Sequence, residues 1–311
     1  MSTVETGKTT SVISTNPPED RKRLRWFGFY LLALCLVFIK PLAVLARYAY
    51  ETEMYSHILL IPLVSGYLIW QRRRERLPAL SSSPALAAIP LALGLLTVHA
   101  FVLLSERKAL GDKCDWLAMT LFAWFCFLQA GALALLGSRL WRAFSFPALF
   151  LIFMVPLPSI MLDGLEIFLQ HASADAAAVL YAVAGQTVFR EDLVFRLPGL
   201  TIQVAQECSG VRSTFVLFIT SWVASYWFLR SRWSRAALVL AVIPLAILRN
   251  GFRIVSISML TVHVDSRIID SPLHHNGGPI FFVLSLIPFF GLLWLLRRLE
   301  QRRAIQDAKP G

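Results

Sequence analysis

Cys208 lies in the segment AQECSGVRSTF, residues 205–215, where polar residues give way to a long apolar run. Ser209 and Gly210 are residue types that suit the start of a helix, and the unbonded amides of a first helical turn stabilise negative charge. With Arg212 nearby, this position favours the thiolate over the thiol. The segment therefore has the features of a cysteine nucleophile.

Other features of the same segment count against a reactive thiol. Glu207 is adjacent to Cys208, and its carboxylate disfavours a thiolate unless it points away or orients a base. A cysteine packed at a helix entry is the structural alternative, because cysteine is among the residue types most often buried.

Arg253 is the second group that suggests chemistry. It lies within the apolar run LRNGFRIVSISML, near the outer end of that run. An arginine at such depth costs at least about 2.5 kcal/mol on insertion scales, so it is expected to face a polar cavity or partner rather than lipid. Arg249 lies one turn deeper, where we interpret it as a snorkelling residue or a helix brace, and Asn250 lies on the adjacent helical stripe.

A histidine pair, His274-His275, stands at the mouth of the last apolar run. Two loop histidines taken alone are more often solvated than catalytic. Here Cys208 precedes one apolar run, Arg253 lies near the end of the next, and His274 precedes the third. The sequence therefore predicts that a thiol, a guanidinium and an imidazole meet at one membrane surface.

The composition is that of an integral membrane protein. Of the 311 residues, 57% are hydrophobic and 16% are charged. The net charge of +11 comes from basic residues clustered between apolar segments, which is the pattern that orients helices in a bilayer, and we exclude nucleic-acid binding on that ground. The run RKRLR at residues 21–25 precedes an apolar segment without a small-residue exit site, which indicates an uncleaved first helix.

The expected fold class is an all-α integral membrane protein with about eight transmembrane helices. A helix needs about 20 apolar residues to cross the hydrocarbon core. Lys and Arg collect in alternate connections, so both termini are expected in the cytoplasm. The eight expected spans, of which the second is short, lie near residues 27–46, 57–70, 84–104, 116–136, 143–162, 211–229, 236–258 and 280–296.

The longest outer segment covers about residues 163–210 and leads directly to the sixth span. It begins with a weakly apolar helical run and then alternates in TVFREDLVFRLPGLTIQVAQ. This pattern predicts a short periplasmic helix followed by a β-hairpin that turns at Pro198-Gly199.

The chain is expected to form one membrane domain between two basic cytoplasmic tails. The predicted boundaries are residues 1–25 for the first tail, 26–297 for the membrane domain and 298–311 for the second tail.

The cysteines do not indicate a metal site. Cys35 and Cys126 lie in apolar runs, whereas Cys114 and Cys208 lie in polar surroundings. No CxxC spacing occurs, and no Asp or Glu is clearly placed to complete a site with His274, His275 and Cys208. We therefore expect no metal and no cofactor.

Three blocks of the sequence resemble the signature blocks of the exosortase/archaeosortase family. They are ECSGVRS at residues 207–213, NGFR at residues 250–253 and H-x-x-x-G from His274 to Gly278. A fourth block, Y-S-H-x-x-L-I-P-L at residues 55–63, is similar to the family's second-helix pattern and is followed by a tryptophan and an arginine run. Each block alone is weak evidence, but the combination is specific and the resemblance covers most of the chain.

The resemblance implies a cysteine-type transpeptidase of the bacterial inner membrane that acts on the periplasmic side. Its substrates would be exported proteins with a C-terminal sorting signal of the PEP-CTERM kind: a short Pro-containing motif, one transmembrane helix and a basic end. The family's catalytic set carries over to Cys208, Arg253 and His274. His275 is the fallback, because a one-residue slip that uses Gly277 also fits the histidine block.

Ordinary acyl-transfer chemistry joins these assignments. Cys208 would be the nucleophile, Arg253 would stabilise the oxyanion or the thiolate, and His274 would be the general acid and base. A thioacyl intermediate would pass to an acceptor, with an extracellular polysaccharide or lipid as candidate acceptors and the lipid bilayer as the remaining partner. The residues expected to contact substrate are Tyr55, Ser56, His57, Glu207, Ser209, Arg212 and Asn250.

Two alternatives stay open at this stage. For His57, a structural hydrogen bond is at least as good an explanation as catalysis. For the whole chain, a transporter or polysaccharide-export component could use Arg253 and the histidine pair to bind an anionic substrate. No inverted repeat and no polar constellation on the cytoplasmic side support the second alternative.

Overall fold

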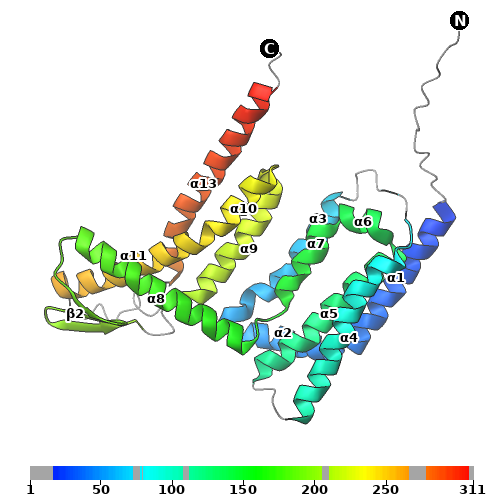
Figure 1. Cartoon of the computed structure of the whole chain (residues 1–311), viewed down its shortest axis with the longest axis horizontal. Helices are drawn as coiled ribbons and strands as arrows, with labels where there is room; N and C mark the ends of the chain where they lie inside the picture. The colour runs from blue at the N-terminus through cyan, green and yellow to red at the C-terminus, as the bar shows by residue number, and fades with distance from the viewer. Residues whose placement is uncertain are drawn as a thin grey trace, which may run out of the picture. The chain divides into compact units, whose positions relative to one another are not determined.

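A computed structural model describes residues 17–72, 78, 80–107, 112–204, 210–265 and 278–307. These residues form helices and one small three-stranded sheet (Figure 1). The chain divides into two compact units, Met1–Ser159 and Ile160–Gly311, and each unit is described by itself.

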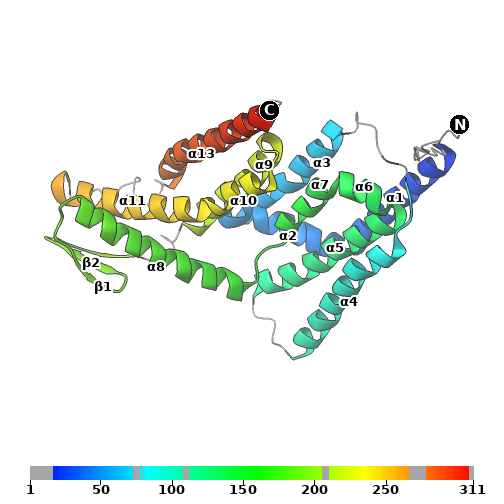
Figure 2. The ribbon, with the colours of Figure 1, turned by 45° about the horizontal axis from the view of Figure 1, so that its top comes forward.

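The first unit is helical throughout its described residues. Its centre is α5, which packs against α1, α2 and α4 and buries Leu117 and Leu121 completely. Both views show α4 and α5 side by side (Figures 1 and 2). The elements are α1 (Pro17–Val37), α2 (Ile39–Glu51), the 3-10 helix η1 (Glu53–Leu60), α3 (Ile61–Arg72), α4 (Pro84–Glu106), α5 (Lys113–Leu135), α6 (Gly137–Ala143), α7 (Ser145–Phe150) and the 3-10 helix η2 (Leu151–Met154).

The first expected span, residues 27–46, is not one straight helix. The chain bends by 69° between α1 and α2. Pro41 explains the bend, because proline has no N–H to donate to the carbonyl of Val37 and its ring disfavours a continuous helix. Hydrogen bonding resumes directly afterwards, where the N–H of Leu42 donates to the carbonyl of Phe38 at 3.0 Å.

The fifth expected span, residues 143–162, is also broken. Helix α7 ends at Phe150, η2 ends at Met154, and a new helix begins only at Ser159. Pro156 and Pro158 stand in the gap, and a residue that precedes a proline is disfavoured in the helical region. Asp115 of α5 caps the new start by accepting hydrogen bonds of 2.7 Å from both the backbone N–H and the hydroxyl of Ser159.

The second unit combines long helices with the sheet. Its elements are α8 (Ser159–Val183), β1 (Phe189–Glu191), β2 (Val194–Leu197), β3 (Leu200–Gln203), α9 (Val211–Phe228), α10 (Arg232–Leu240), α11 (Val242–His263) and α13 (Gly278–Asp307). The sheet lies beside α8 and α11 in both views (Figures 1 and 2).

The predicted hairpin is confirmed. Strands β2 and β3 pair antiparallel with Leu197 opposite Leu200, so that Pro198 and Gly199 form the turn. Gly199 has a φ of +78°, which glycine adopts without steric cost and which suits the residue after a turn proline. A third antiparallel strand, β1, pairs with β2 and was not expected from the sequence.

The sheet is held on the helices by its apolar side. Phe195 and Leu197 of β2 are buried and pack with Ala177 and Tyr181 of α8 and Val255 of α11. The intervening Arg196 is exposed, as the two-residue period of a strand requires. The sheet therefore fixes the chain that leads out of β3 against the two helices.

The apolar helices confirm an all-α membrane protein in outline. Four helices in the described residues are long and apolar enough to cross a bilayer, and up to six if two bent pairs are each one span. The four are Pro84–Glu106, Lys113–Leu135, Arg232–His263 and Gly278–Gln306, which match the third, fourth, seventh and eighth expected spans. The full set of eight and the cytoplasmic placement of both termini stay predictions.

Helices α8 and α11 cross closely at Gly251. A Cβ atom built on Gly251 would lie 2.9 Å from the Cβ of Ala176 and 3.0 Å from the backbone nitrogen of Ala177. Small residues on both helices therefore let the backbones meet, which is the usual way in which membrane helices pack.

We predict that Gly251→Val lowers the unfolding midpoint of the detergent-solubilised protein, because the new side chain meets backbone atoms and overpacking costs about 1–3 kcal/mol. Gly291→Val is the matched control, since Gly291 is also helical and has no atom within 4 Å of its built Cβ. Equal midpoints for the two variants would contradict the close crossing.

Candidate functional site

The predicted catalytic set is only partly within the described residues. Arg253 lies on α11 and is partly buried. Cys208 and the histidine pair, His274 and His275, lie outside the described residues, as do the flanking candidates Glu207 and Ser209. Both ends of the cysteine segment, however, are described, and so is the arginine-bearing helix.

The first end of the segment, Val204, is anchored on α8 and on the sheet. Its N–H donates to the carbonyl of Leu193 at 2.9 Å, which extends the β2–β3 pairing by one step. Its carbonyl accepts a 2.5 Å hydrogen bond from Nε2 of Gln170. The side chain is 2% exposed and belongs to the core between the sheet, α8 and α11.

The second end, Gly210, is anchored on α11. Nη2 of Arg249 donates to the carbonyl oxygen of Gly210 at 3.2 Å and lies 3.4 Å from Oγ1 of Thr214. The same carbonyl accepts from the hydroxyls of Ser213 at 3.0 Å and Thr214 at 2.8 Å. The described residues on the two sides of the cysteine segment, Val204 and Gly210, are therefore both anchored on neighbouring elements.

Gly210 must be glycine at this contact. Its φ is +72°, a left-handed conformation that side chains with a Cβ rarely adopt. A Cβ atom would also lie 2.9 Å from Nη2 of Arg249 and 3.0 Å from Oδ1 of Asn250. The start of α9 thus touches the two residues that begin the R-N-G-F-R run of α11.

The amino end of helix α9 lies at this contact between Gly210 and α11. The helix is 18 residues long and starts at Val211, with Gly210 as its N-cap. The first amides of a helix have no carbonyl partner within it, and the helix dipole places partial positive charge there. The predicted substrate-contacting residue Arg212 is exposed in this first turn.

Asn250 links α11 to α8. Its Nδ2 donates to Oγ of Ser173 at 3.1 Å, and the two residues are 2% and 0% exposed. A second buried pair, Tyr181 and Ser258, joins the two helices further along. These contacts fix the depth and rotation of α11, and therefore the position of Arg249 and Arg253 on it.

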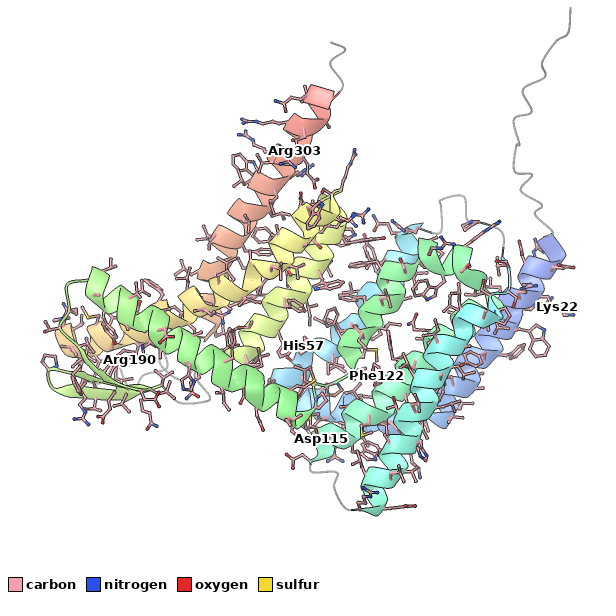
Figure 3. The ribbon with its side chains drawn as sticks, in the orientation of Figure 1. Lys22, His57, Asp115, Phe122, Arg190 and Arg303 are labelled. Atoms are coloured by element: carbon pink, nitrogen blue, oxygen red, sulfur yellow. The ribbon has the colours of Figure 1, made fainter. Side chains whose placement is uncertain are left out.

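The candidates Tyr55, Ser56 and His57 lie in the first unit. Tyr55 is 6% exposed and belongs to the core of that unit, where its hydroxyl lies 3.3 Å from Sγ of Cys114. Ser56 is exposed, and His57 is partly buried on η1, where Figure 3 labels it.

Cys114 was expected in polar surroundings, and the structure corrects this. It is 8% exposed in the core of the first unit. Its thiol donates to the carbonyl of Leu157 at 3.2 Å and contacts Tyr55, so that a weak polar group is satisfied inside an apolar cluster.

Sequence reasoning did not identify the residues of α8 that brace the site. Gln170 binds Val204 and Ser173 binds Asn250. They are three residues apart and therefore lie on one face of the helix. Two polar residues at that spacing in a weakly apolar run were the available signal.

Metal ligands do not gather in the described part of the chain. No group of three or more His, Cys, Asp or Glu side chains that could hold a metal ion occurs there. The set considered from the sequence, His274, His275 and Cys208, lies outside the described residues.

Comparison with protein families gives one finding. A family model described as transmembrane exosortase matches residues 49–291, which is more than half of the chain. Comparison with curated proteins gave no match, and comparison with solved structures gave none either. Together with the apolar helices, the family match identifies a multi-pass membrane protein.

We predict that Gly210→Ala disturbs the site more than an ordinary substitution at a left-handed glycine. Backbone strain of about 1–2 kcal/mol is expected in any such variant. Gly185→Ala is the matched control, because Gly185 has a φ of +70° but nothing within 4 Å of its built Cβ.

The difference between these two variants isolates the contact with α11. We expect a lower thermal unfolding midpoint for Gly210→Ala than for Gly185→Ala in the detergent-solubilised protein. If the two midpoints fall by the same amount, Gly210 is needed only for its backbone conformation, and the proposed anchoring on Arg249 and Asn250 is wrong.

Proposed function

Because the chain belongs to the transmembrane exosortase family, we propose that it is a cysteine-type transpeptidase that cleaves the C-terminal sorting signals of exported proteins. Its substrates are membrane-anchored proteins that carry a short Pro-containing motif before one transmembrane helix. Cys208 is the nucleophile, Arg253 stabilises developing negative charge, and His274 is the general acid and base.

One observation supports the assignment of these roles to these particular residues. The hydrogen bond from Arg249 to Gly210 joins the cysteine block to the residue that directly precedes the arginine block, far away in the sequence. Gly210 is two residues after Cys208, so the two Cα atoms are at most about 7.6 Å apart. Arg253 follows Arg249 by one helical turn on the same side of α11, which supports a shared site.

The reaction is an acyl transfer in two stages. The Cys208 thiolate attacks the scissile carbonyl carbon, and the resulting oxyanion is stabilised by Arg253. Collapse of the tetrahedral intermediate breaks the C–N bond, and His274 gives its proton to the departing amine. The product is a thioester between Cys208 and the exported protein, with the anchor helix released.

An acceptor then resolves the thioester. Neutral His274 removes a proton from an incoming amine, hydroxyl or water, which attacks the thioester carbonyl and frees the Cys208 thiolate. An extracellular polysaccharide or lipid is the proposed acceptor. His275 takes the role of His274 if the histidine block is read one residue later.

The bilayer contributes to positioning. Substrate and enzyme are both anchored in one membrane, so the cleavage motif meets the enzyme at a fixed height. The proposed site is on the periplasmic side of the bacterial inner membrane, because the alternate basic connections predict that α9 and α13 start on that side. Arg212, exposed at the start of α9, is the described candidate best placed to contact substrate.

The other candidates for substrate contact differ in how exposed their side chains are. Asn250 is 2% exposed, so its proposed contribution is to hold α11 rather than to touch substrate. Tyr55 is 6% exposed in the core of the first unit, so we do not propose that it touches substrate. Exposed Ser56 and partly buried His57 stay candidates for substrate contact, as do Glu207 and Ser209.

The direct test of the proposal is processing of a C-terminally anchored substrate. We expect Cys208→Ala, coexpressed with candidate proteins, to leave the substrate at full length on a gel, whereas the unsubstituted enzyme shortens it. Mass spectrometry of the new C-terminus identifies the bond and the acceptor. Cys35→Ala is the matched control and should process normally, because Cys35 lies in α1 among apolar residues.

The role of Arg253 has its own expected outcome. Arg253→Gln should abolish processing and Arg253→Lys should retain part of it, since lysine keeps the charge but loses the fork of donors. Normal processing by Cys208→Ala, in a strain without another enzyme of this family, would refute the scheme.

A further inference from the structure

Arg249 has a hydrogen-bonding group that its surroundings do not use. The residue is 8% exposed, and its Nη2 donates to Gly210 and Thr214. Its Nη1 is buried and has no hydrogen-bond acceptor among the described residues. An unused buried donor is rare in folded proteins and calls for an explanation.

Among the described residues, the charge of Arg249 also has no ion-pair partner. The ion pairs in the described residues involve Arg47, His171, Arg190 and Arg196, and none involves Arg249. Its acceptors are a neutral carbonyl and a neutral hydroxyl. A buried cation without a counter-charge costs several kcal/mol, so this position is expected to be compensated by an anion when the protein works.

Two further features near Arg249 favour the binding of an anion. The guanidinium lies at the amino end of the 18-residue helix α9, whose first amides and dipole attract negative charge. Arg253 lies four residues along the same side of α11, and like charges at that spacing repel unless an anion lies between them.

We propose that Arg249 and the first turn of α9 form a binding site for an anionic oxygen of the peptide substrate. The oxygen is either a carboxylate or the oxyanion that forms on the attacked carbonyl. The site itself is inferred from α9 and α11, and its use in catalysis rests on the proposed function. Away from bulk water, the charge pair is stronger than the same pair at the surface.

In this site Arg249 has a binding role that the sequence did not suggest. A helix brace needs only the bond from Nη2 to Gly210, whereas an anion site also uses Nη1. Arg249 is therefore a binding residue for the substrate, and its contact with Gly210 places that binding function two residues from Cys208.

Two small alkylating reagents test the site without a known substrate. Iodoacetate and iodoacetamide both form an S–C bond with a thiolate and expel iodide, but only iodoacetate carries a carboxylate. Their rates at Cys208 are measured in the full-length protein in a neutral detergent, by mass spectrometry of the peptide that contains Cys208. N-acetylcysteine amide in the same solution supplies the reference ratio of the two rates.

We expect the ratio of the iodoacetate rate to the iodoacetamide rate at Cys208 to exceed the reference ratio about tenfold. Arg249→Gln should bring it to the reference value, and Arg249→Lys should retain part of the preference. Arg230→Gln is the matched control, because Arg230 has the same charge but is exposed and follows the opposite end of α9. Its ratio should change by less than about threefold, since an exposed charge is screened by water and salt.

A measurement on the unsubstituted protein covers the case in which Arg249→Gln does not fold. Sodium acetate should slow alkylation by iodoacetate in a saturable way and leave iodoacetamide unaffected, at constant ionic strength. A ratio equal to the reference, or equal losses in Arg249→Gln and Arg230→Gln, would overturn the anion site. So would an absence of competition by acetate.

The outcome separates this inference from the proposed function. An absent preference for iodoacetate, together with loss of processing in Cys208→Ala, removes the anion site and leaves the transpeptidase. A clear preference, together with normal processing in Cys208→Ala, removes the transpeptidase and leaves the anion site.

Discussion

The contact between Gly210 and Arg249 is the constraint on which the second unit depends. One carbonyl oxygen accepts from a guanidinium and from two hydroxyls, and only glycine has both the backbone freedom and the small size that the position demands. Val204, the described residue on the other side of the cysteine segment, is fixed on the sheet and on α8.

Holding two arginines on one apolar helix requires support from its neighbours. Helix α8 supplies small residues that let Gly251 approach, and it supplies Ser173 as a partner for Asn250. The sheet packs against both α8 and α11 through Phe195 and Leu197. Asn250 and Ser173 thus pair inside the unit, and such pairing is what allows polar side chains at membrane depth.

The sequence predicted those features that depend on local pattern. Long apolar runs predicted four helices that are long and apolar enough to cross a bilayer, and Pro198-Gly199 predicted the turn of the hairpin. The breaks at Pro41 and at Pro156 and Pro158 were visible as prolines, but hydrophobicity alone favoured uninterrupted spans there.

The tertiary features could not be predicted in this way. The bond between Arg249 and Gly210 joins residues 39 positions apart, and no local pattern tells which of two arginines on one helix face will make it. The braces Gln170 and Ser173 depend on how α8 crosses α11. The resemblance to the family suggested Arg253 as a catalytic candidate. The contact between Arg249 and Gly210 became visible only from the packing of α9 on α11.

The central claim is that Cys208 and Arg253 share one site on one side of the membrane. The most direct test is to cross-link Cys208 to a cysteine at position 253, introduced by Arg253→Cys with the other three cysteines replaced by serine, using a short bismaleimide in intact membranes. The account predicts an intramolecular cross-link between the peptides that contain positions 208 and 253. Separate single adducts at both positions, with no peptide joined to the other, would contradict it.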